Sequence, residues 1–378
     1  MAATAPHGIA LLGAGIFAKT AHLPAIAAAD TLKLLAVYSR SLSSATELSE
    51  AAKTHPTITS AVDIYADDSA AKGDLTALLK REDIETVVLA LPITLQPSII
   101  EQAFQAGKNV ISEKPVAPTV EEGKRLIDLY EKEYKPKGIT WIVAEQYPYE
   151  AGYNKAREIV AAGKIGTVRS FNLDFYGFVV PDSKYHATSW RNKPDYQGGF
   201  LLDGGVHFVA GLRHMLPHPI TTVTATRALI QKHLPPFDTL AGFFTTSEPT
   251  LNGTFNISFG IEASSTRQYT LRGSKGTLTV AFGQTQVLTL TTLSTNPEEP
   301  TSHEIVIELP SQGVVHEFEA FGEALTEGVG SESWKLVESR SGPRATLRDL
   351  AIIEGALNSG GSGEKVDLRK LAGEHWEI

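Results

Sequence analysis

Apolar and polar positions alternate in two different ways along the 378-residue chain. In the first 146 residues, short apolar runs alternate with segments of helical periodicity, which is typical of a parallel sheet with crossover helices. Strands are predicted over residues 8–12, 34–38, 63–65, 86–91, 109–112 and 140–145, and helices over 17–29, 43–53, 75–81, 96–106 and 120–134. We therefore predict an α/β domain over residues 1–146.

After Tyr149 most of the chain shows the alternation of apolar and polar residues that predicts strands. A predicted helix over 153–162 is followed by strands over 168–179, 220–230, 240–244, 253–259, 268–272, 276–280, 285–292 and 303–309. Because few helices separate these strands, their sheet should be mostly antiparallel. Helices are predicted over 316–326 and 345–358, and polar loops over 294–302 and 359–364. Residues 147–378 are thus expected to form an α+β domain with a large open sheet, whose last helix is a candidate to pack back on the first domain.

Composition excludes several classes of function. Apolar residues make up 42% of the chain and charged residues 20%, as in soluble globular proteins. The net charge is −9 and no cluster of Lys and Arg is present, which argues against nucleic-acid binding. No apolar run reaches the ~18–20 residues that span a bilayer, so we expect a cytoplasmic protein that binds no membrane. The chain has no cysteine, which excludes disulfides, thiolate nucleophiles and Cys-based metal sites.

A glycine loop follows the first predicted strand, with the sequence Gly13-Ala14-Gly15-Ile16-Phe17-Ala18. Gly13 permits the tight turn, Gly15 lets the backbone approach a pyrophosphate, and Ala18 keeps helix and strand close. The N-terminus of the following helix offers unpaired N–H groups to phosphates. The loop therefore predicts a Rossmann domain that binds a dinucleotide; the alternative is a glycine turn in a similar fold that binds nothing.

The end of the second predicted strand favours NADP(H) over NAD(H). NAD-binding proteins usually place Asp or Glu there, on the ribose 2′-hydroxyl. This chain instead has Ser39 and Arg40, which can donate to a 2′-phosphate, and Arg40 can stack on the adenine. The alternative is that Arg40 is an ordinary solvated charge and that both cofactors bind.

Two further segments carry candidate catalytic groups. Glu113-Lys114-Pro115 follows the fifth predicted strand, at the sheet edge where ligands bind. Lys114 can hold a substrate oxygen there, or it is a surface lysine paired with Glu113. Asp203 and His207 are four residues apart, so a helix would place them on one face, where the acid can orient the base. The alternative for this pair is a helix-capping Asp and a buried structural His.

These motifs together resemble the glucose–fructose oxidoreductase / inositol dehydrogenase (Gfo/Idh/MocA) family, and most closely its fungal NADP(H)-linked members. The similarity covers essentially the whole chain, and includes Trp190-Arg191 and the run from Gly198-Gly199 to His207. The resemblance implies that Lys114, Asp203 and His207 are catalytic, and that the protein is a homodimer or higher homo-oligomer. The residues expected to contact the cofactor are Gly13, Gly15, Ile16, Phe17, Ser39, Arg40, Leu91, Pro92, Glu113, Lys114, Gln146, Trp190 and Arg191.

The reaction we expect is hydride transfer between a nicotinamide and a carbonyl or alcohol carbon of a sugar, polyol or related small molecule. His207 would exchange the proton, Lys114 would stabilise the negative oxygen, and Asp203 would orient His207 or hold a substrate hydroxyl. One alternative is reduction of an imine or another C=X bond. Another is a non-catalytic regulator that senses NADP(H) and binds a protein partner, which has no need for these three residues. No metal is expected, because Pro217 separates His214 from His218.

Overall fold

The computed structural model describes residues 5–59, 61–68, 73–293 and 302–377, which form two compact units. Of the described residues, those up to Gln146 and Val314–Thr346 belong to the first unit, and the others belong to the second. Residues 314–346 therefore group with the first unit, whereas the sequence pattern assigned them to a domain over 147–378. The predicted loop over 294–302 lies almost entirely outside the described residues.

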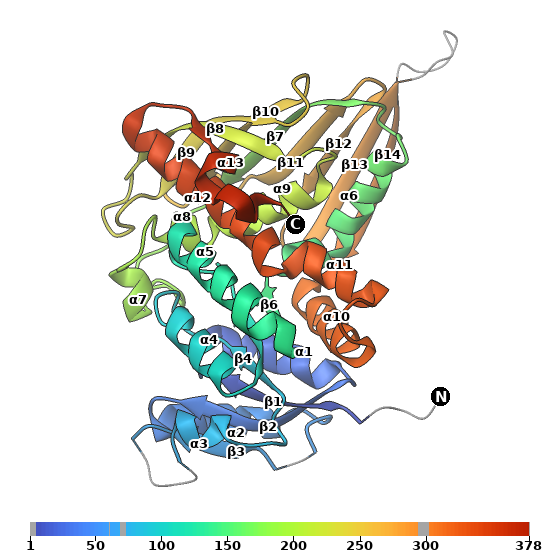
Figure 1. Cartoon of the computed structure of the whole chain (residues 1–378). Coiled ribbons are helices and arrows are strands. Elements are labelled where there is room, and N and C mark those ends of the chain that lie inside the picture. Colours follow the sequence, from blue (N-terminus) through green and yellow to red (C-terminus); the bar gives the residue numbers. More distant parts are fainter. Residues whose placement is uncertain (1–4, 60, 69–72, 294–301, 378) are drawn as a thin grey trace. The chain divides into compact units, whose positions relative to one another are not determined.

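The first unit is built on a six-stranded parallel sheet with the order β3-β2-β1-β4-β5-β6. This arrangement confirms the predicted Rossmann-type α/β fold, and the strand order reverses between β1 and β4, where such sheets bind ligands. The strands are β1 (His7–Leu12), β2 (Leu32–Ser39), β3 (Asp63–Ala66), β4 (Thr86–Leu89), β5 (Asn109–Glu113) and β6 (Trp141–Ala144) (Figure 1).

Short helices connect and cover these strands. They are α1 (Leu23–Ala28), α2 (Leu42–Lys53), α3 (Leu75–Leu79), α4 (Gln96–Gln105), α5 (Val120–Leu129), α10 (Gly313–Glu327) and α11 (Glu332–Ser341). A π-helical turn, Ala18–His22, precedes α1, and another, Tyr130–Tyr134, extends α5 and runs into a 3-10 turn, Lys135–Lys137. Side chains cap α2, α3, α5 and α11, because Ser41, Asp74, Thr119 and Ser331 each accept a backbone N–H of the first turn.

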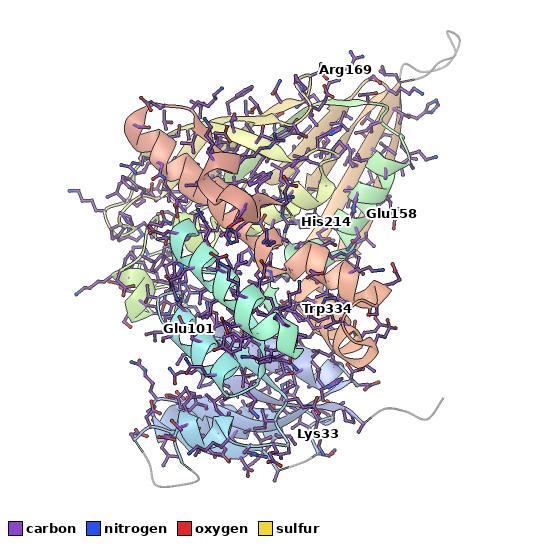
Figure 2. All side chains as sticks on the ribbon, viewed as in Figure 1. Lys33, Glu101, Glu158, Arg169, His214 and Trp334 are labelled. Atoms are coloured by element: carbon purple, nitrogen blue, oxygen red, sulfur yellow. The ribbon has the colours of Figure 1, made fainter. Side chains whose placement is uncertain are left out.

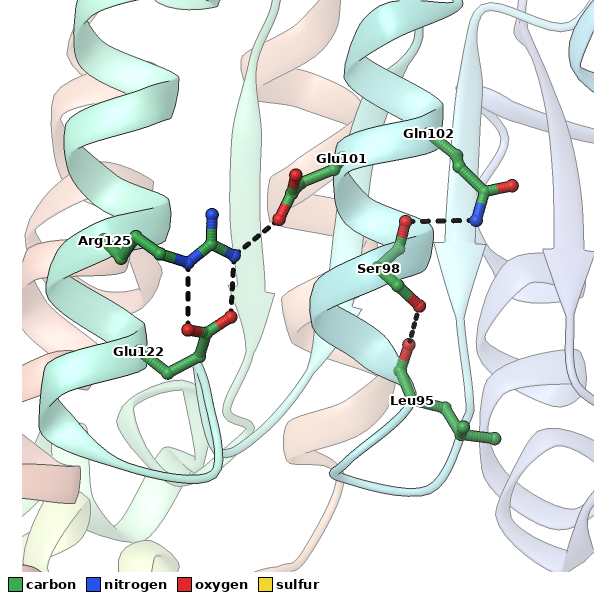
Figure 3. Close-up of polar contacts among 6 residues, drawn as sticks. All are labelled: Leu95, Ser98, Glu101, Gln102, Glu122 and Arg125. Atoms are coloured by element: carbon green, nitrogen blue, oxygen red, sulfur yellow. Dashed lines mark hydrogen bonds and ion pairs between the residues drawn. The ribbon is translucent and has the colours of Figure 1, made fainter.

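Polar contacts join α4 to α5 (Figure 3). Arg125 of α5 donates from Nη2 to Glu101 of α4 at 2.5 Å, and from Nε and Nη2 to both oxygens of Glu122 at 2.9 and 2.7 Å. These carboxylates raise the pKa of Arg125. The core of the unit is apolar: Ile9 to Leu12 of β1 are fully buried, and Trp334 of α11, labelled in Figure 2, is buried as well.

The second unit is built on a nine-stranded sheet with the order β14-β13-β12-β11-β7-β10-β9-β8-β15. All neighbours are antiparallel except β7 and β10, which confirms the predicted α+β domain with a mostly antiparallel sheet. The strands are β7 (Val168–Tyr176), β8 (Ile220–Ala228), β9 (Thr239–Thr246), β10 (Asn252–Ser258), β11 (Arg267–Gly273), β12 (Gly276–Ala281), β13 (Thr285–Leu293), β14 (Ser302–Pro310) and β15 (Val366–Asp367).

Helices α6 (Ala151–Ala161) and α13 (Leu368–Ala372) pack directly on strands of this sheet (Figure 1). The other helices of the unit are α7 (Ser189–Asn192), α8 (Phe200–Asp203), α9 (Gly205–Met215) and α12 (Pro343–Ser362), with 3-10 turns at Tyr147–Tyr149 and Gly373–Trp376. His214 of α9, labelled in Figure 2, bonds through Nε2 to Asn154 of α6. The atoms are 3.0 Å apart, and Tyr269 of β11 donates to the Phe208 carbonyl at 2.9 Å. These contacts fix α9 against both α6 and the sheet.

The predicted polar loop over 359–364 is wrong for its first four residues, because α12 continues to Ser362. The Ser359 hydroxyl accepts the Ala225 N–H of β8 at 2.9 Å and donates to the Glu364 carbonyl at 2.6 Å. A Cβ added at Gly360 would lie 2.9 Å from Arg227, so glycine is needed where β8 approaches. Tertiary packing on β8 therefore outweighs the low helix propensity of this segment.

Candidate active site

The glycine loop between β1 and the following helix has two glycines with different tasks. Gly13 is buried with a φ of +106°, and its N–H donates to the Tyr38 carbonyl at 2.8 Å. A Cβ at Gly13 would lie 2.3 Å from the Ala90 carbonyl oxygen, so no other residue fits. Gly15 is exposed, and a Cβ there would have nothing within 4 Å. Gly13 is thus needed where the loop packs against the end of β4, and Gly15 leaves open space beside the loop.

The chain becomes helical directly after this loop. Ile16 and Phe17 are helical and half-buried, and a π-helical turn, Ala18–His22, precedes α1, where the sequence predicted one regular helix from residue 17. The first N–H groups of a helix have no partner within it, and the helix dipole is positive at that end. Open space at Gly15 in front of such a terminus fits the pyrophosphate of a dinucleotide. Leu91 lies beside the loop, with Cδ2 3.1 Å from the Cβ position of Gly13, and Pro92 follows it, half-buried.

The edge formed by the ends of β2 and β3 carries more charge than the sequence indicated. Ser39 is half-buried and Arg40 exposed at the end of β2. Two carboxylates from the end of β3 reach the same edge, which the residues at the end of β2 did not indicate. Asp67 accepts the Tyr38 hydroxyl at 2.7 Å, and Asp68 accepts the first N–H of α2, from Leu42, at 2.7 Å.

The Tyr38 hydroxyl is influenced by these charges. Burial and the hydrogen bond to Asp67 raise the pKa of Tyr38, and the Arg40 guanidinium opposes this shift. The edge thus carries both a guanidinium, from Arg40, and carboxylates, from Asp67 and Asp68.

The turn after β5 holds Lys114 between a buried acid and a proline. The Glu113 carboxylate is buried: Oε2 accepts the backbone N–H of Lys114 at 3.1 Å, and Oε1 bonds with Nε2 of His22 at 2.6 Å. The Lys114 side chain is half-buried, and the Lys114–Pro115 peptide bond is cis. Glu113 therefore has a defined structural task that the sequence reasoning missed, because its partner His22 is 91 positions away.

In the second unit, Asp203 ends α8 and His207 lies in the first turn of α9. Gly204 between them has φ −95° and ψ −34°, so the helical path continues from one helix to the next. The predicted spacing of one helical turn between the two side chains is thus retained. The Gly198-Gly199 pair starts this path with φ values of +73° and +53°. The backbone N–H of Asp203 donates to the Gly199 carbonyl at 3.1 Å.

The Asp203 carboxylate is held by Arg191. Arg191 Nε donates to Oδ2 of Asp203 at 2.6 Å, and the two side chains are 15% and 10% exposed. The guanidinium carbon lies 3.8 Å from the centre of the Trp190 ring and 5.2 Å from that of Tyr185. The structure therefore joins the Trp190-Arg191 motif to Asp203, a contact across a loop that the spacing alone does not predict.

The His207 ring stacks on Tyr147, with ring centres 5.0 Å apart and planes inclined by 16°. Gly211, one turn further along α9, makes room for this stack, because a Cβ there would lie 3.1 Å from the Tyr147 ring. His207 is half-buried, as is Gln146, the last residue of the first unit before the 3-10 turn. Stacking fixes the plane of the imidazole, as a directed proton transfer requires.

Tyr196 is a polar group of this region that sequence reasoning did not single out. Its ring lies 5.8 Å from Trp190 and is 7% exposed, and its hydroxyl makes no hydrogen bond among the described residues. Burial raises the pKa of Tyr196, and the Asp203 charge raises it further. The only signal in the sequence was its position two residues before the Gly198-Gly199 pair.

Comparison with known proteins identifies the family to which both units belong. Residues 7–137 match the oxidoreductase family with an NAD-binding Rossmann fold, and residues 153–279 match the GFO/IDH/MocA C-terminal domain. The chain is 35% identical to Dehydrogenase FPY6 of Fusarium mangiferae over 368 residues, which cover 96% of this chain and 99% of that protein. It is 31% identical to a dTDP-3,4-didehydro-2,6-dideoxy-alpha-D-glucose 3-reductase of Streptomyces violaceoruber, over 54% of this chain and 56% of the reductase.

The whole fold is also found in a solved structure. The crystal structure of an oxidoreductase from Thermotoga maritima matches with a TM-score of 0.78 and 29% identity, over 97% of this chain and 99% of that one. In the parts of this chain that the structure describes, no helix is long and apolar enough to cross a membrane. The dinucleotide loop on a parallel sheet, the nine-stranded second unit and these matches over nearly the full length make this chain an NAD(P)-binding oxidoreductase of the Gfo/Idh/MocA family.

Proposed function

We propose that the protein is an NADP(H)-dependent oxidoreductase that interconverts a carbonyl and an alcohol on a sugar, polyol or related small molecule. The observation that carries the proposal is the glycine loop, in which a buried Gly13 supports an exposed Gly15 with open space before a helix N-terminus. The bound nicotinamide would supply or accept the hydride, and the protein would supply position and electric field.

Three side chains would act on the substrate. Lys114 would hold the substrate oxygen and stabilise its developing negative charge, a contribution of ~2.7–4 kcal/mol when such a donor is lost. His207, kept in plane by Tyr147, would give that oxygen a proton during reduction and take it back during oxidation. Asp203 would orient His207 or hold a neighbouring substrate hydroxyl, while Arg191 fixes its carboxylate.

A sugar-like substrate is supported by the relative from Streptomyces violaceoruber, whose name is that of a reductase of a dTDP-linked keto sugar. The preference for NADP(H) is supported by Ser39 and Arg40, which offer a hydroxyl and a guanidinium at the end of β2. Asp67 and Asp68 at the same edge oppose that preference, so the strength of the Arg40 contact decides it.

We also propose that the protein is a cytoplasmic homo-oligomer. The cysteine-free composition suits a reducing compartment. The oligomer is what the family resemblance implies, and no element of the catalytic proposal depends on it.

The test is a fluorescence titration of wild-type protein with NADPH and with NADH, repeated on Arg40→Ala. The control is Lys33→Ala, which removes an exposed cation at the opposite end of the same strand (Figure 2). Loss of a charge-assisted contact costs ~1.5–3 kcal/mol, so NADPH should bind Arg40→Ala about tenfold or more weakly, with NADH little changed. Equal binding of both cofactors by wild type would contradict the NADP assignment, and binding of neither would contradict the enzyme proposal.

A further inference from the structure

We propose that His22 is a positioning residue for Lys114, acting through Glu113. The inference rests on the proposed function, because it concerns how the turn that carries Lys114 is held. His22 ends the π-helical turn that follows the glycine loop, and Glu113 ends β5. The contact therefore joins the loop proposed to bind the dinucleotide to the turn proposed to act on the substrate.

Two hydrogen bonds form the chain from His22 to Lys114. His22 Nε2 lies 2.6 Å from Oε1 of Glu113, and Oε2 of the same carboxylate accepts the backbone N–H of Lys114 at 3.1 Å. His22 is fully buried and Glu113 is 9% exposed, so water does not replace either bond readily. The Glu113 carboxylate is thereby held at both oxygens. Because it bonds the Lys114 backbone, it also holds the start of the turn that carries Lys114.

The direction of the first bond follows from the chemistry of the groups. A carboxylate can only accept, so the proton of the 2.6 Å bond is on Nε2 of His22. Nδ1 of His22 is buried and has no hydrogen-bond partner among the described residues. The ring therefore holds Glu113 through Nε2 alone.

Aromatic packing keeps the imidazole from turning away. The Phe17 ring meets it edge-on at 5.1 Å, and Phe318 of α10 lies at 5.2 Å on a tilted plane. Phe17 belongs to the glycine-loop segment itself, so the same ring that holds Glu113 also touches the loop. His22 thus links the turn that carries Lys114 to the loop that follows β1, although the mechanism proposed for Lys114 does not otherwise use it.

The experiment compares His22→Leu, which has no donor, with His22→Gln, whose amide Nε2 can replace the ring Nε2–H. The matched control is His7→Leu, because His7 also pairs with a glutamate at 2.7 Å in the same unit, but its partner Glu85 is 53% exposed. The first readout is hydrogen exchange of the Lys114 backbone amide, which reports on its bond to Glu113 without any turnover. The second is NADPH affinity, and the third is kcat against KM for the carbonyl compound that wild type reduces fastest.

In His22→Leu, the Lys114 amide should exchange about tenfold faster or more, the equivalent of one charge-assisted hydrogen bond. The value of kcat should fall about 10- to 100-fold, as for a misplaced catalytic group, with little change in KM or NADPH affinity. His22→Gln should restore most of both effects, and His7→Leu should show neither.

Unchanged Lys114 exchange in His22→Leu, or faster exchange spread evenly over the first unit, would overturn the inference. If His22→Leu does not fold, exchange of the Lys114 amide in His22→Gln and Glu113→Gln tests the inference instead. Glu113→Gln should release the Lys114 amide, and His22→Gln should not; the reverse pattern contradicts the proposal. Wild-type protein that reduces no carbonyl compound would instead refute the proposed function, whatever the exchange of Lys114.

Discussion

Two buried Arg–Asp pairs of the second unit allow the role of Asp203 to be separated from its structural contribution. Asp203 is 10% exposed and accepts one bond from Arg191, at 2.6 Å. Asp349 of α12 is 3% exposed and accepts two bonds from Arg213 of α9, at 2.7 and 2.9 Å. Replacing each aspartate by asparagine removes the charge and keeps the shape. Only Asp203 belongs to the proposed catalytic group.

The expected loss of stability follows from these contacts. A hydrogen bond to a charged group contributes ~1.5–3 kcal/mol, so both variants should be destabilised by an amount of this order. Asp349→Asn should lose more stability, because the amide can accept only one of the two Arg213 bonds and the place is drier. For a domain of about 150–250 residues, 1 kcal/mol corresponds to ~2–4 °C in Tm, so each variant should melt several degrees below wild type.

Activity should separate the two variants where stability does not. We expect Asp203→Asn to lower kcat by about tenfold or more, because His207 or a substrate hydroxyl loses its carboxylate partner. Asp349→Asn should keep the wild-type kcat at temperatures below its transition. Thermal denaturation gives the Tm of each variant, and steady-state kinetics gives its kcat. If kcat falls equally in the two, or follows Tm alone, the role of Asp203 is structural and the reasoning is refuted.

Three further predictions concern single positions. Gly13→Ala should lower Tm markedly, because its Cβ would lie 2.3 Å from a backbone oxygen. Gly15→Ala should have the Tm of wild type but bind NADPH less tightly. Equal Tm values for the two variants would contradict this difference. Asp68→Asn should bind NADPH more tightly at low salt with NADH unchanged, since one carboxylate fewer faces the 2′-phosphate; titration at two salt concentrations checks it. Tyr196→Phe should unfold at the same or a higher temperature, because the lost hydroxyl has no partner among the described residues, and a fall of several degrees would show otherwise.

Local sequence signals were sufficient for much of the fold. Strand and helix periods, Pro and Gly positions and the glycine loop placed all six strands of the first sheet in order along the chain. They also placed Lys114 at the end of β5 and the Asp203–His207 spacing on a helical path. These features depend on residues within a few positions of one another, which is the range over which periodicity and turn chemistry act.

The contacts that hold the candidate site were not predictable in this way. His22 meets Glu113 across 91 positions, and Asp67 meets Tyr38 across 29. Such pairs arise when parallel strands and their loops meet at one sheet edge, and the order of strands in the sheet must be known first. The helical end of α12 is a similar case, since Arg227 and Ser359 stabilise a glycine-rich segment that local propensity marks as a loop.

The central claim is that the protein transfers hydride with the help of Lys114, and NADPH consumption tests it most directly. Wild type, Lys114→Met and the control Lys132→Met, whose cation is 70% exposed in the same unit, are incubated with deuterium-labelled NADPH and a panel of keto sugars. The account predicts that wild type consumes NADPH and delivers deuterium to the carbonyl carbon. It also predicts that Lys114→Met still binds NADPH but loses about 100-fold or more in kcat, while Lys132→Met matches wild type. NADPH binding without consumption by wild type, or full activity in Lys114→Met, would contradict the account.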